Sequence, residues 1–428
     1  MVFESQTTFS LIAWGKFGTD SSGFLTDLLQ RLRFLASDER LKNIELTNLD
    51  LDSSDLTKEL ANTWTKCAAS SRIFRRITWT DCEGESIESL LVPLEWNSVQ
   101  EMVCCREPLD QSLNWTSHRF PNCTRLQSLR LEVCQVGSSA LQTLTSTPNL
   151  ESLHFQGCDL EPDCIPVLVE FLQTNKTLKT FKVHWSGLED VQLAVLSRAL
   201  LYHPSLKEWD LAGNICREHG MDAVSGLIMQ SNTLETLCLR EQCCVEQGKL
   251  DITSLVTALS ATPPPSCCSL VRLDLSVNKL DDDDMIQLAG ALSSNKTLKE
   301  LDVRCNRITN RGVEIFARES LVTMGLRKLW LQGNHNIDEE GAMAMRDMLK
   351  VNVHLEYVGF SQDFTCWYEL EYYTALNWGG RRLLQEINNI DIAVWPLILE
   401  RAGKYGRMDR TASILYYLLR GGPALLYR

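Results

Sequence analysis

The pattern of apolar positions repeats with a period of 28 residues between Leu270 and Asn334. Each copy reads Leu-x-x-Leu-x-Leu-x-x-Asn, and the copies begin at Leu270, Leu298 and Leu326. Side chains alternate between the two faces of a strand, so the second and third leucines of a copy lie on the same face. The pattern therefore predicts one short strand per copy, with one buried face and one exposed face.

A helix is predicted to follow each strand. In the copy that begins at Leu270, the acidic run Asp281–Asp284 leads into apolar residues at helical spacing between Met285 and Leu292. The start of a helix carries partial positive charge, so these carboxylates are predicted to cap it. Consecutive helix residues point in different directions, and we therefore reject a metal site in this run.

The residue that ends each copy predicts a ladder of polar side chains. An amide at this position can bind backbone groups that stacking would otherwise leave buried without a partner. The later copies carry Asn278, Asn306 and Asn334, and earlier ones carry Cys82, Cys134 and Cys158. A single copy cannot bury its apolar face alone, so neighbouring copies are predicted to stack into one continuous core.

The spacing of the copies divides the chain into three regions. Regular copies of about 28 residues occupy residues 126–362. They begin at Leu126, Leu150, Leu178, Leu206, Leu234, Leu270, Leu298, Leu326 and Leu355. Residues 1–125 hold less regular copies, the first of which we place at Phe9-Ser-Leu-Ile-Ala-Trp14. We interpret this region as irregular N-terminal repeats and a cap, because a terminal repeat lacks a neighbour on one side.

An insertion at residues 262–268, with the sequence Thr-Pro-Pro-Pro-Ser-Cys-Cys, interrupts the regular copies. Three prolines cannot continue a helix and favour an extended conformation. The segment is predicted to loop away from the stack. We interpret it as a tolerated insertion, with a proline-motif docking site as the alternative.

Residues 363–428 do not follow the repeat and are rich in Trp and Tyr. Helices are predicted at Tyr368–Leu376, Ile392–Arg401 and Thr411–Leu419. From Asn377 onward there are eight Lys or Arg and four Asp or Glu, so the net charge of this part is +4, whereas that of the rest of the chain is −17. We interpret the region as a helical C-terminal cap over the last repeat, with a separate partner-binding segment as the alternative.

Composition narrows the class of protein. With 44% hydrophobic and 23% charged residues, the 428-residue chain is predicted to fold. Its net charge of −13 argues against nucleic-acid binding, which depends on Lys and Arg meeting phosphate, and against anionic membrane surfaces. No stretch approaches the roughly 18 apolar residues of a membrane span. The first residues also lack the form of a secretory signal. We therefore expect a cytoplasmic protein, with the nucleus left open, that binds neither nucleic acid nor membrane.

The sixteen cysteines are expected to be free thiols, because the cytosol keeps most cysteines reduced. The adjacent pairs Cys104-Cys105, Cys243-Cys244 and Cys267-Cys268 lack a Cys-x-x-Cys or His-x-x-x-His companion. We therefore predict no zinc site and no cofactor. The glycosylation-type matches at Asn175 and Asn295 fall where repeat helices are predicted to end, and we interpret both asparagines as structural.

The repeated Leu-x-x-Leu-x-Leu motif, its 28-residue spacing and the segment Ser-Asn-Lys-Thr-Leu at 294–298 resemble the ribonuclease-inhibitor-like leucine-rich-repeat family. The resemblance is specific from about residue 126 to residue 360. It implies an α/β fold, a curved solenoid that winds as a right-handed βα superhelix, with parallel strands on the concave face and helices on the convex face. Members of the family include inhibitors, sensors and GTPase-activating proteins, so the resemblance implies architecture better than function. No Gly-x-x-x-x-Gly-Lys-Ser/Thr loop is present to support a nucleotide-binding role.

Candidate functional residues are those that the strand pattern places on the exposed face. Aromatic and arginine side chains are enriched at interface hot spots, which favours a concave surface that binds a protein partner. The candidates are His154, His184, Trp185, Asp210, Arg240, Arg272, Asp274, Asp302, Arg304, Trp330 and Tyr357. Part of this surface is expected to neutralise itself through ion pairs around Asp274 and Asp302.

We predict a non-catalytic scaffold rather than an enzyme. His154 and His184 fall on neighbouring strands but in different columns, and no Ser or Cys is evidently paired with either. An open sheet also does not exclude water as catalysis usually requires. Two alternatives stay open: an inhibitor of an enzyme, and a GTPase regulator that offers Arg240 or Arg304 to phosphoryl charge. We expect a monomer, with oligomerisation through the tail as the alternative.

Overall fold

The structure is a computed structural model, and it describes most of the regular repeats. The described residues are 2–5, 8–12, 43–47, 75–80, 99–106, 124–242, 248–260, 269–319, 325–360 and 364–382, with 396, 397, 400, 415, 416 and 420. The chain forms two compact units, Met1–Asn214 and Ile215–Arg428, called unit 1 and unit 2 below and described separately.

Unit 1 is built on a sheet in which successive strands of the chain are neighbours. The strands are β1 (Val2–Ser5), β2 (Thr8–Ile12), β3 (Asn43–Thr47), β4 (Arg76–Thr80), β5 (Glu101–Cys105), β6 (Ser128–Glu132), β8 (Ser152–Gln156), β10 (Thr180–His184) and β11 (Glu208–Asp210). A second, two-stranded sheet pairs β7 (Gln135–Val136) with β9 (Asp159–Leu160). The helices are α5 (Ser138–Thr145), α6 (Cys164–Thr174) and α7 (Asp190–Leu200).

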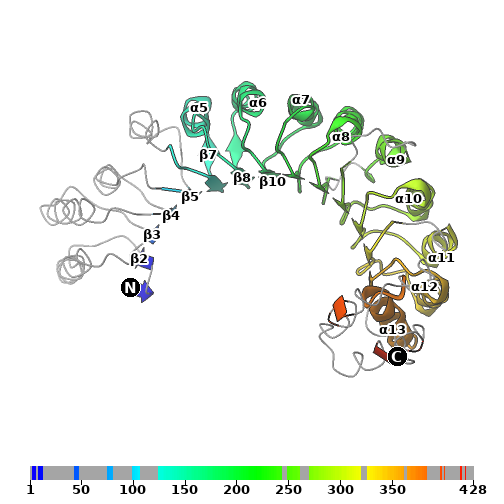
Figure 1. The fold of residues 1–428 in the computed structure, drawn as a ribbon. Helices are drawn as coiled ribbons and strands as arrows, with labels where there is room; N and C mark the ends of the chain where they lie inside the picture. Colours follow the sequence, from blue (N-terminus) through cyan, green and yellow to red (C-terminus); the bar gives the residue numbers. More distant parts are fainter. Residues whose placement is uncertain are drawn as a thin grey trace, which may run out of the picture. The chain divides into compact units, whose positions relative to one another are not determined.

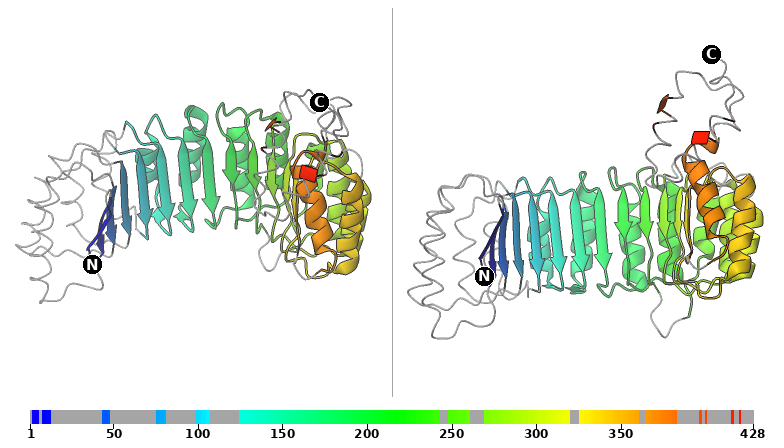
Figure 2. Two further views of the ribbon diagram at one scale, coloured as in Figure 1. Left: turned by 60° about the horizontal axis from the view of Figure 1, so that its bottom comes forward. Right: turned by 90° about the horizontal axis from the view of Figure 1, so that it is seen from below.

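Unit 2 repeats the same arrangement. Its strands are β12 (Thr236–Cys238), β13 (Arg272–Asp274), β14 (Glu300–Asp302), β15 (Lys328–Trp330) and β16 (Tyr357–Gly359), all parallel to their neighbours. Its helices are α8 (Glu218–Gln230), α9 (Thr253–Ser260), α10 (Asp282–Ser294), α11 (Asn310–Glu319), α12 (Glu339–Val351) and α13 (Trp367–Trp378). In each unit the strands line the inner side of the curve and the helices its outer side (Figure 1). The strands lie side by side within each unit (Figure 2).

These units confirm the predicted α/β class and the stacking of βα repeats. In the copy at Leu270, the leucines at 270, 273 and 275 are buried, whereas Arg272 and Asp274 between them face outward. The acidic run caps its helix as predicted. Asp281 accepts hydrogen bonds from the amides of Asp283 and Asp284, and the Asp284 carboxylate accepts one from the Asp281 amide.

Two expectations at the N-terminus are corrected. The sheet is not wholly parallel, because β1 pairs with β2 in the antiparallel sense. Strand β1 does not carry the Leu-x-x-Leu motif, so the repeat pattern did not predict it. The first copy was also misaligned: Phe9, rather than Ile12, is the register partner of Ile44. Alternating apolar residues in this short segment fit the template in more than one register.

Several predictions concern residues that the structure does not describe. These are the proline insertion, Cys82, and nearly all of the two helices predicted after residue 390. The predicted helix Tyr368–Leu376 is present as α13, which is slightly longer at both ends.

The predicted ladder of asparagines, called the strand-exit ladder here, is present in unit 2. Asn306 is the clearest member. Its Nδ2 donates to the carbonyls of Leu275 in the preceding copy (3.1 Å) and Val303 in its own copy (2.9 Å). Its Oδ1 accepts from the amides of Asn278 (2.9 Å) and Leu280 (3.0 Å). One side chain therefore satisfies four backbone groups and joins two repeats.

Unit 1 continues the strand-exit ladder with a change of chemistry. Asn214 Nδ2 donates to the Val183 carbonyl at 2.6 Å, and its Oδ1 accepts from the Leu188 amide at 3.1 Å. Where Cys158 stands in this position, its thiol lies 3.3 Å from the Leu131 carbonyl, in the geometry of a weak donor. A thiol lacks the oxygen of an asparagine amide, so a cysteine at this position makes fewer hydrogen bonds to the neighbouring repeat.

A second ladder, the helix-end ladder, was not predicted in full. Asn175 and Asn295 are buried at the ends of α6 and α10, and each Oδ1 accepts two backbone amides that follow it. This confirms that both asparagines are structural. His203 takes the same position after α7, and its Nδ1 accepts from the amides of Ser205 (3.4 Å) and Leu206 (3.2 Å).

The strand-exit ladder gives a direct stability prediction. Replacing Asn306, which is 7% exposed, with Leu leaves its backbone partners buried without hydrogen bonds. At about 1 kcal/mol or more for each unsatisfied group, we expect the free energy of unfolding to fall by about 3 to 5 kcal/mol in urea titrations. Asn232→Leu, at an exposed asparagine, serves as the control and is expected to change stability by less than about 0.5 kcal/mol. Equal effects of the two changes would contradict the ladder argument.

His203 predicts a pH dependence of stability. Burial, together with the charge of Lys176, lowers its pKa from 6.5 to about 4. Between these values the unfolded chain binds a proton that the folded chain does not, so stability falls as pH drops from about 6.5 towards 4. The loss is about 2 kcal/mol at pH 5 from this group. The variant His203→Asn places at this position the residue found at 175 and 295. We expect the free energy of unfolding of this variant, measured by denaturation at pH 7 and pH 5, to fall by about 2 kcal/mol less than that of the unchanged protein.

Candidate functional site

The exposed strand face of unit 1 carries a group of polar residues, called the histidine cluster here: Arg130, His154, Lys182, His184 and Asp210. In the sheet register His154 is opposite Lys182, so the two histidines are diagonal neighbours, as the different columns predicted. They nevertheless touch. His154 Nε2 lies 3.4 Å from His184 Nδ1, and the ring centroids are 4.8 Å apart. On the next strand, Asp210 Oδ2 lies 2.8 Å from His184 Nε2.

The electrostatics of the cluster keep His154 uncharged. Burial, with smaller contributions from the neighbouring His184, Arg130 and Lys182, lowers its pKa to about 4. The cations have acidic partners of their own: Lys182 Nζ is 2.5 Å from Glu208 Oε1, and Arg130 pairs with Glu132. The cluster is thus a charge-balanced patch whose histidines are ordered by Asp210.

The two histidines and Asp210 form a chain of polar contacts across β8, β10 and β11. A proton on His184 Nε2 points at Asp210, which leaves His184 Nδ1 to accept from His154. A hydrolytic arrangement would need a nucleophile within about 3 Å of a base, whereas the contacts described for the two histidines join them to each other and to Asp210. Among the described residues, no group of three or more His, Cys, Asp or Glu side chains is arranged to hold a metal ion.

Trp185 lies just outside the strand rather than within it. It follows β10 with φ of +44°, and 47% of it is exposed. Its indole covers Gly213, where a Cβ would lie only 1.9 Å from Trp185 Cδ1. Other copies place Gly157, Gly213 and Gly333 at the equivalent turn, also with positive φ. The left-handed backbone therefore belongs to the repeat, since Val133, Glu241, Val277 and Cys305 also have positive φ at this turn. Glycine adopts this backbone without strain, whereas Trp185 adopts it at a cost.

Unit 2 presents an aromatic surface, defined by Arg272, Glu300, Lys328, Trp330 and Tyr357. The Trp330 and Tyr357 rings are 5.6 Å apart at 50°. The Arg272 guanidinium lies over the Trp330 ring at 5.7 Å. Glu300 lies between the two cations, 2.7 Å from Lys328 Nζ and 3.8 Å from Arg272. The structure thus brings three sequence candidates, Arg272, Trp330 and Tyr357, into one continuous patch.

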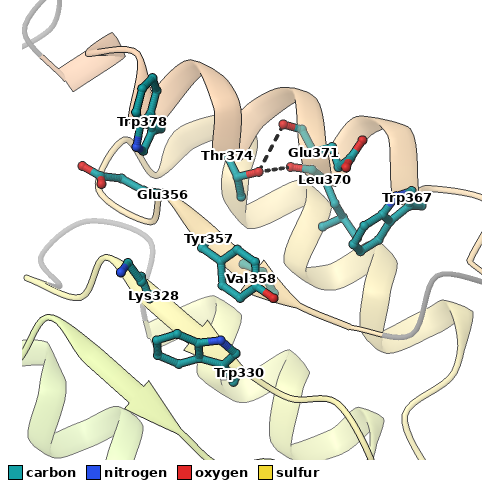
Figure 3. Close-up of a pocket in the computed structure, with 10 residues that line it drawn as sticks. All are labelled: Lys328, Trp330, Glu356, Tyr357, Val358, Trp367, Leu370, Glu371, Thr374 and Trp378. Carbon is teal, nitrogen blue, oxygen red and sulfur yellow. Dashed lines mark hydrogen bonds between the residues drawn. The ribbon is translucent and has the colours of Figure 1, made fainter. Parts of the chain in front are cut away.

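Helix α13 turns this patch into a pocket of about 450 Å³ (Figure 3). Its lining residues are Lys328, Trp330, Glu356, Tyr357, Val358, Trp367, Leu370, Glu371, Thr374 and Trp378. The last five belong to α13 and follow helical spacing, so they form one face of that helix. Sequence reasoning missed this half of the pocket because it treated the aromatic tail as a cap. The spacing of Trp367, Leu370, Thr374 and Trp378 was the signal that could have revealed it.

The remaining candidates mostly have structural bonds. Asp302 was predicted on the exposed face, yet it is 1% exposed. Its carboxylate accepts the Arg304 amide and both Nε and Nη2 of the Arg304 guanidinium. The carboxylates of Asp274 and Asp210 likewise accept hydrogen bonds from the backbone amides two residues later, those of Ser276 and Ala212. The expected pairing of Arg272 with Asp274 is replaced by Arg272 with Glu300. Arg240 is exposed just after β12.

Comparison with known proteins agrees with this architecture. The family model described as Leucine Rich repeat matches residues 266–289 and 294–317. The chain is 30% identical over 213 residues to NACHT, LRR and PYD domains-containing protein 4C of Mus musculus, covering 49% of this chain and 18% of that protein. It is 23% identical over 279 residues to the Ribonuclease inhibitor of Mus musculus, covering 57% of this chain and 59% of that protein. The chain thus carries leucine-rich repeats and is similar to proteins of the ribonuclease-inhibitor-like family.

The similarity is to parts of these relatives. The chain spans about a fifth of the length of the NACHT-containing relatives. It spans 61% of Leucine-rich repeat-containing protein 73 of Homo sapiens, at 28% identity over 200 residues, or 45% of this chain. Among solved structures, the yeast Rad7 and Elc1 complex matches with a TM-score of 0.45 and 14% identity over 80% of this chain and 92% of that one. Likeness at this level carries no argument about function. Within the described residues, no helix has both the length and the apolarity to cross a membrane.

The geometry of Trp185 gives an unusual stability order. A left-handed backbone costs a residue with a Cβ about 1 kcal/mol or more. We therefore expect Trp185→Gly to be more stable than Trp185→Ala by about 1 kcal/mol in urea titrations. Val191, exposed on α7, is the control, where Gly is expected to be less stable than Ala by a similar amount. If the Gly variant is less stable than the Ala variant at both positions, this account of the turn is wrong.

Proposed function

We propose that this protein is a non-catalytic interaction scaffold that binds a protein partner on the exposed strand faces of its repeats. The observation that carries the proposal is the aromatic surface of unit 2. There Trp330 and Tyr357 lie beside each other and beside Arg272, and 39% of Tyr357 is exposed. Trp, Tyr and Arg are the residues most enriched among interface hot spots.

The rest of the exposed face supports binding by complementarity. Its charges are largely balanced within the face, as in the pairs Lys182 with Glu208 and Lys328 with Glu300. Such pairs contribute less than about 1 kcal/mol each at a surface, but they leave a patch that a partner can cover at low desolvation cost. Buried leucines from every repeat hold these side chains at fixed spacing, so the surface is ordered before a partner arrives.

The alternative of GTPase regulation gains no support from Arg304, one of its two candidate arginines. Arg304 is held by both oxygens of buried Asp302, so presenting it to phosphate would leave that carboxylate without its cation. An enzyme inhibitor is a special case of the scaffold, since it also acts by covering a partner with this surface. We therefore propose protein binding and leave the activity of the partner open.

The proposal includes the cytoplasm as its place of action. All nine cysteines within the described residues are free thiols, and seven of these are buried or half-buried in the repeats rather than placed for pairing across a surface. Free thiols persist where glutathione keeps cysteines reduced.

The test is capture of a partner by the full chain with matched variants. Trp330→Leu keeps an apolar side chain but removes the ring that contacts Tyr357 and Arg272. We expect it to weaken binding of a partner, identified by affinity purification and crosslinking, by about 30-fold, equivalent to about 2 kcal/mol. Met343→Ala changes an exposed apolar residue on α12 and is expected to leave binding unchanged. A partner held equally well by the folded Trp330→Leu protein, or lost in Met343→Ala, would place the interface elsewhere.

A further inference from the structure

We infer that the pocket between α13 and strands β15 and β16 receives a cationic side chain, arginine or lysine, from an extended segment of the protein partner. The inference rests on the proposed function for the existence of a partner. It adds the chemistry that the partner must present and the place where that group binds.

The walls of the pocket are the first reason. Trp330 and Tyr357 come from the sheet, and Trp367 and Trp378 come from opposite ends of α13 (Figure 3). An aromatic ring has a negative face, which attracts a guanidinium or ammonium group and repels a carboxylate or phosphate. Four rings around one pocket therefore favour a cation whose aliphatic stem can also bury against them.

The charges that line the pocket are the second reason. Two carboxylates line the pocket, those of Glu371 and of Glu356, which also lies 3.7 Å from Arg327 Nη1, and Lys328 contributes one ammonium. That ammonium is already compensated, because Lys328 Nζ lies 2.7 Å from Glu300, a residue outside the lining. The lining thus carries one more carboxylate than ammonium groups, which favours a cationic occupant over an anionic one.

The chain's own arginines are the third reason. Two guanidinium groups of unit 2 already lie over aromatic rings: Arg272 over Trp330 at 5.7 Å and Arg381 over Tyr373 at 5.5 Å. The first of these rings belongs to the pocket itself. A partner cation would repeat, on the remaining rings, a contact that this part of the fold makes within the chain.

The size of the pocket indicates that the cation arrives as part of a chain. A volume of about 450 Å³ lies in the range of sites that bury most of a ligand, and exceeds what one small ion fills. The open strand face beside the pocket, with Trp330 and Lys328 along β15, offers a path for the residues that flank the cation.

The experiment measures binding of capped pentapeptides, Ala-Ala-X-Ala-Ala, to the full chain by titration calorimetry and by NMR line broadening of the peptide. The central residue X is arginine, lysine, norleucine or glutamate. We expect the arginine and lysine peptides to bind at least about tenfold more tightly than norleucine, with no binding of the glutamate peptide. Norleucine has the lysine stem without its charge, so it separates a cation site from an apolar one.

Two variants locate the effect. Glu371→Gln and Glu356→Gln each remove one lining charge with little change of shape, and we expect each to weaken arginine binding by about three- to tenfold. Glu314→Gln makes the same change on α11, away from the pocket, and is expected to have no effect.

Several results would overturn the inference: norleucine binding as tightly as lysine, glutamate binding more tightly than arginine, or no saturable binding of any peptide. If the peptides fail while Trp330→Leu still loses the captured partner, the scaffold proposal stands and only the cationic occupant is wrong. If the cationic peptides bind but no partner depends on Trp330, the pocket is a cation site and the scaffold proposal fails.

Discussion

The structure depends on satisfying the backbone where each strand ends. A short strand followed by a turn exposes amides and carbonyls that stacking then buries, and an unpaired buried group is costly. The strand-exit asparagines meet this constraint with both ends of their amide, as Asn306 does for four backbone groups. The helix-end ladder applies the same solution at the other side of each repeat, at Asn175 and Asn295. Leucine packing supplies the core, but the two ladders fix how one repeat is placed on the next.

This division of labour explains where recognition can reside. Positions that carry the leucines and asparagines are determined by the stack, so a change there acts on stability first. The side chains between the leucines face outward and are set by the fold only in direction and spacing. Trp330 and Tyr357 fall on such positions and meet because neighbouring strands are held in register. The His154–His184 contact arises in the same way, across a diagonal of the sheet. Binding surfaces on this fold are therefore assembled from residues about 28 apart in sequence.

The same logic shows how far sequence reasoning could go. The leucine period, the capping by Asp281 and the asparagine ladder were predictable because each repeats and each has one physical role. Asp302 was misjudged because its residue type fits an exposed strand position. Only the structure shows the carboxylate turned back onto its own turn, where Arg304 covers it. The first repeat was misaligned because one copy with alternating apolar residues offers no neighbour to fix its register. The pocket half on α13 was missed because nothing in the period relates that helix to the strand face.

The end of the stack explains why a pocket forms there. Strand β16 is the last of its sheet, and an exposed edge of this kind invites unwanted pairing unless it is covered. Helix α13 packs beside this strand and is anchored to the end of α12 and the loop that follows it: Asn377 Nδ2 donates to the carbonyls of Asn352 and Leu355, and Arg381, just after α13, donates to those of Leu349 and Lys350. In the inner repeats of the described chain the helices pack against neighbouring helices on the outer side of the sheet. A helix that closes an edge also projects beyond it, and the Trp367 to Trp378 face of α13 therefore reaches the side of the sheet on which Trp330 and Tyr357 lie. The proposed roles of capping and recognition are thus compatible for this segment, because the helix that packs beside the last strand is also the one that completes the pocket.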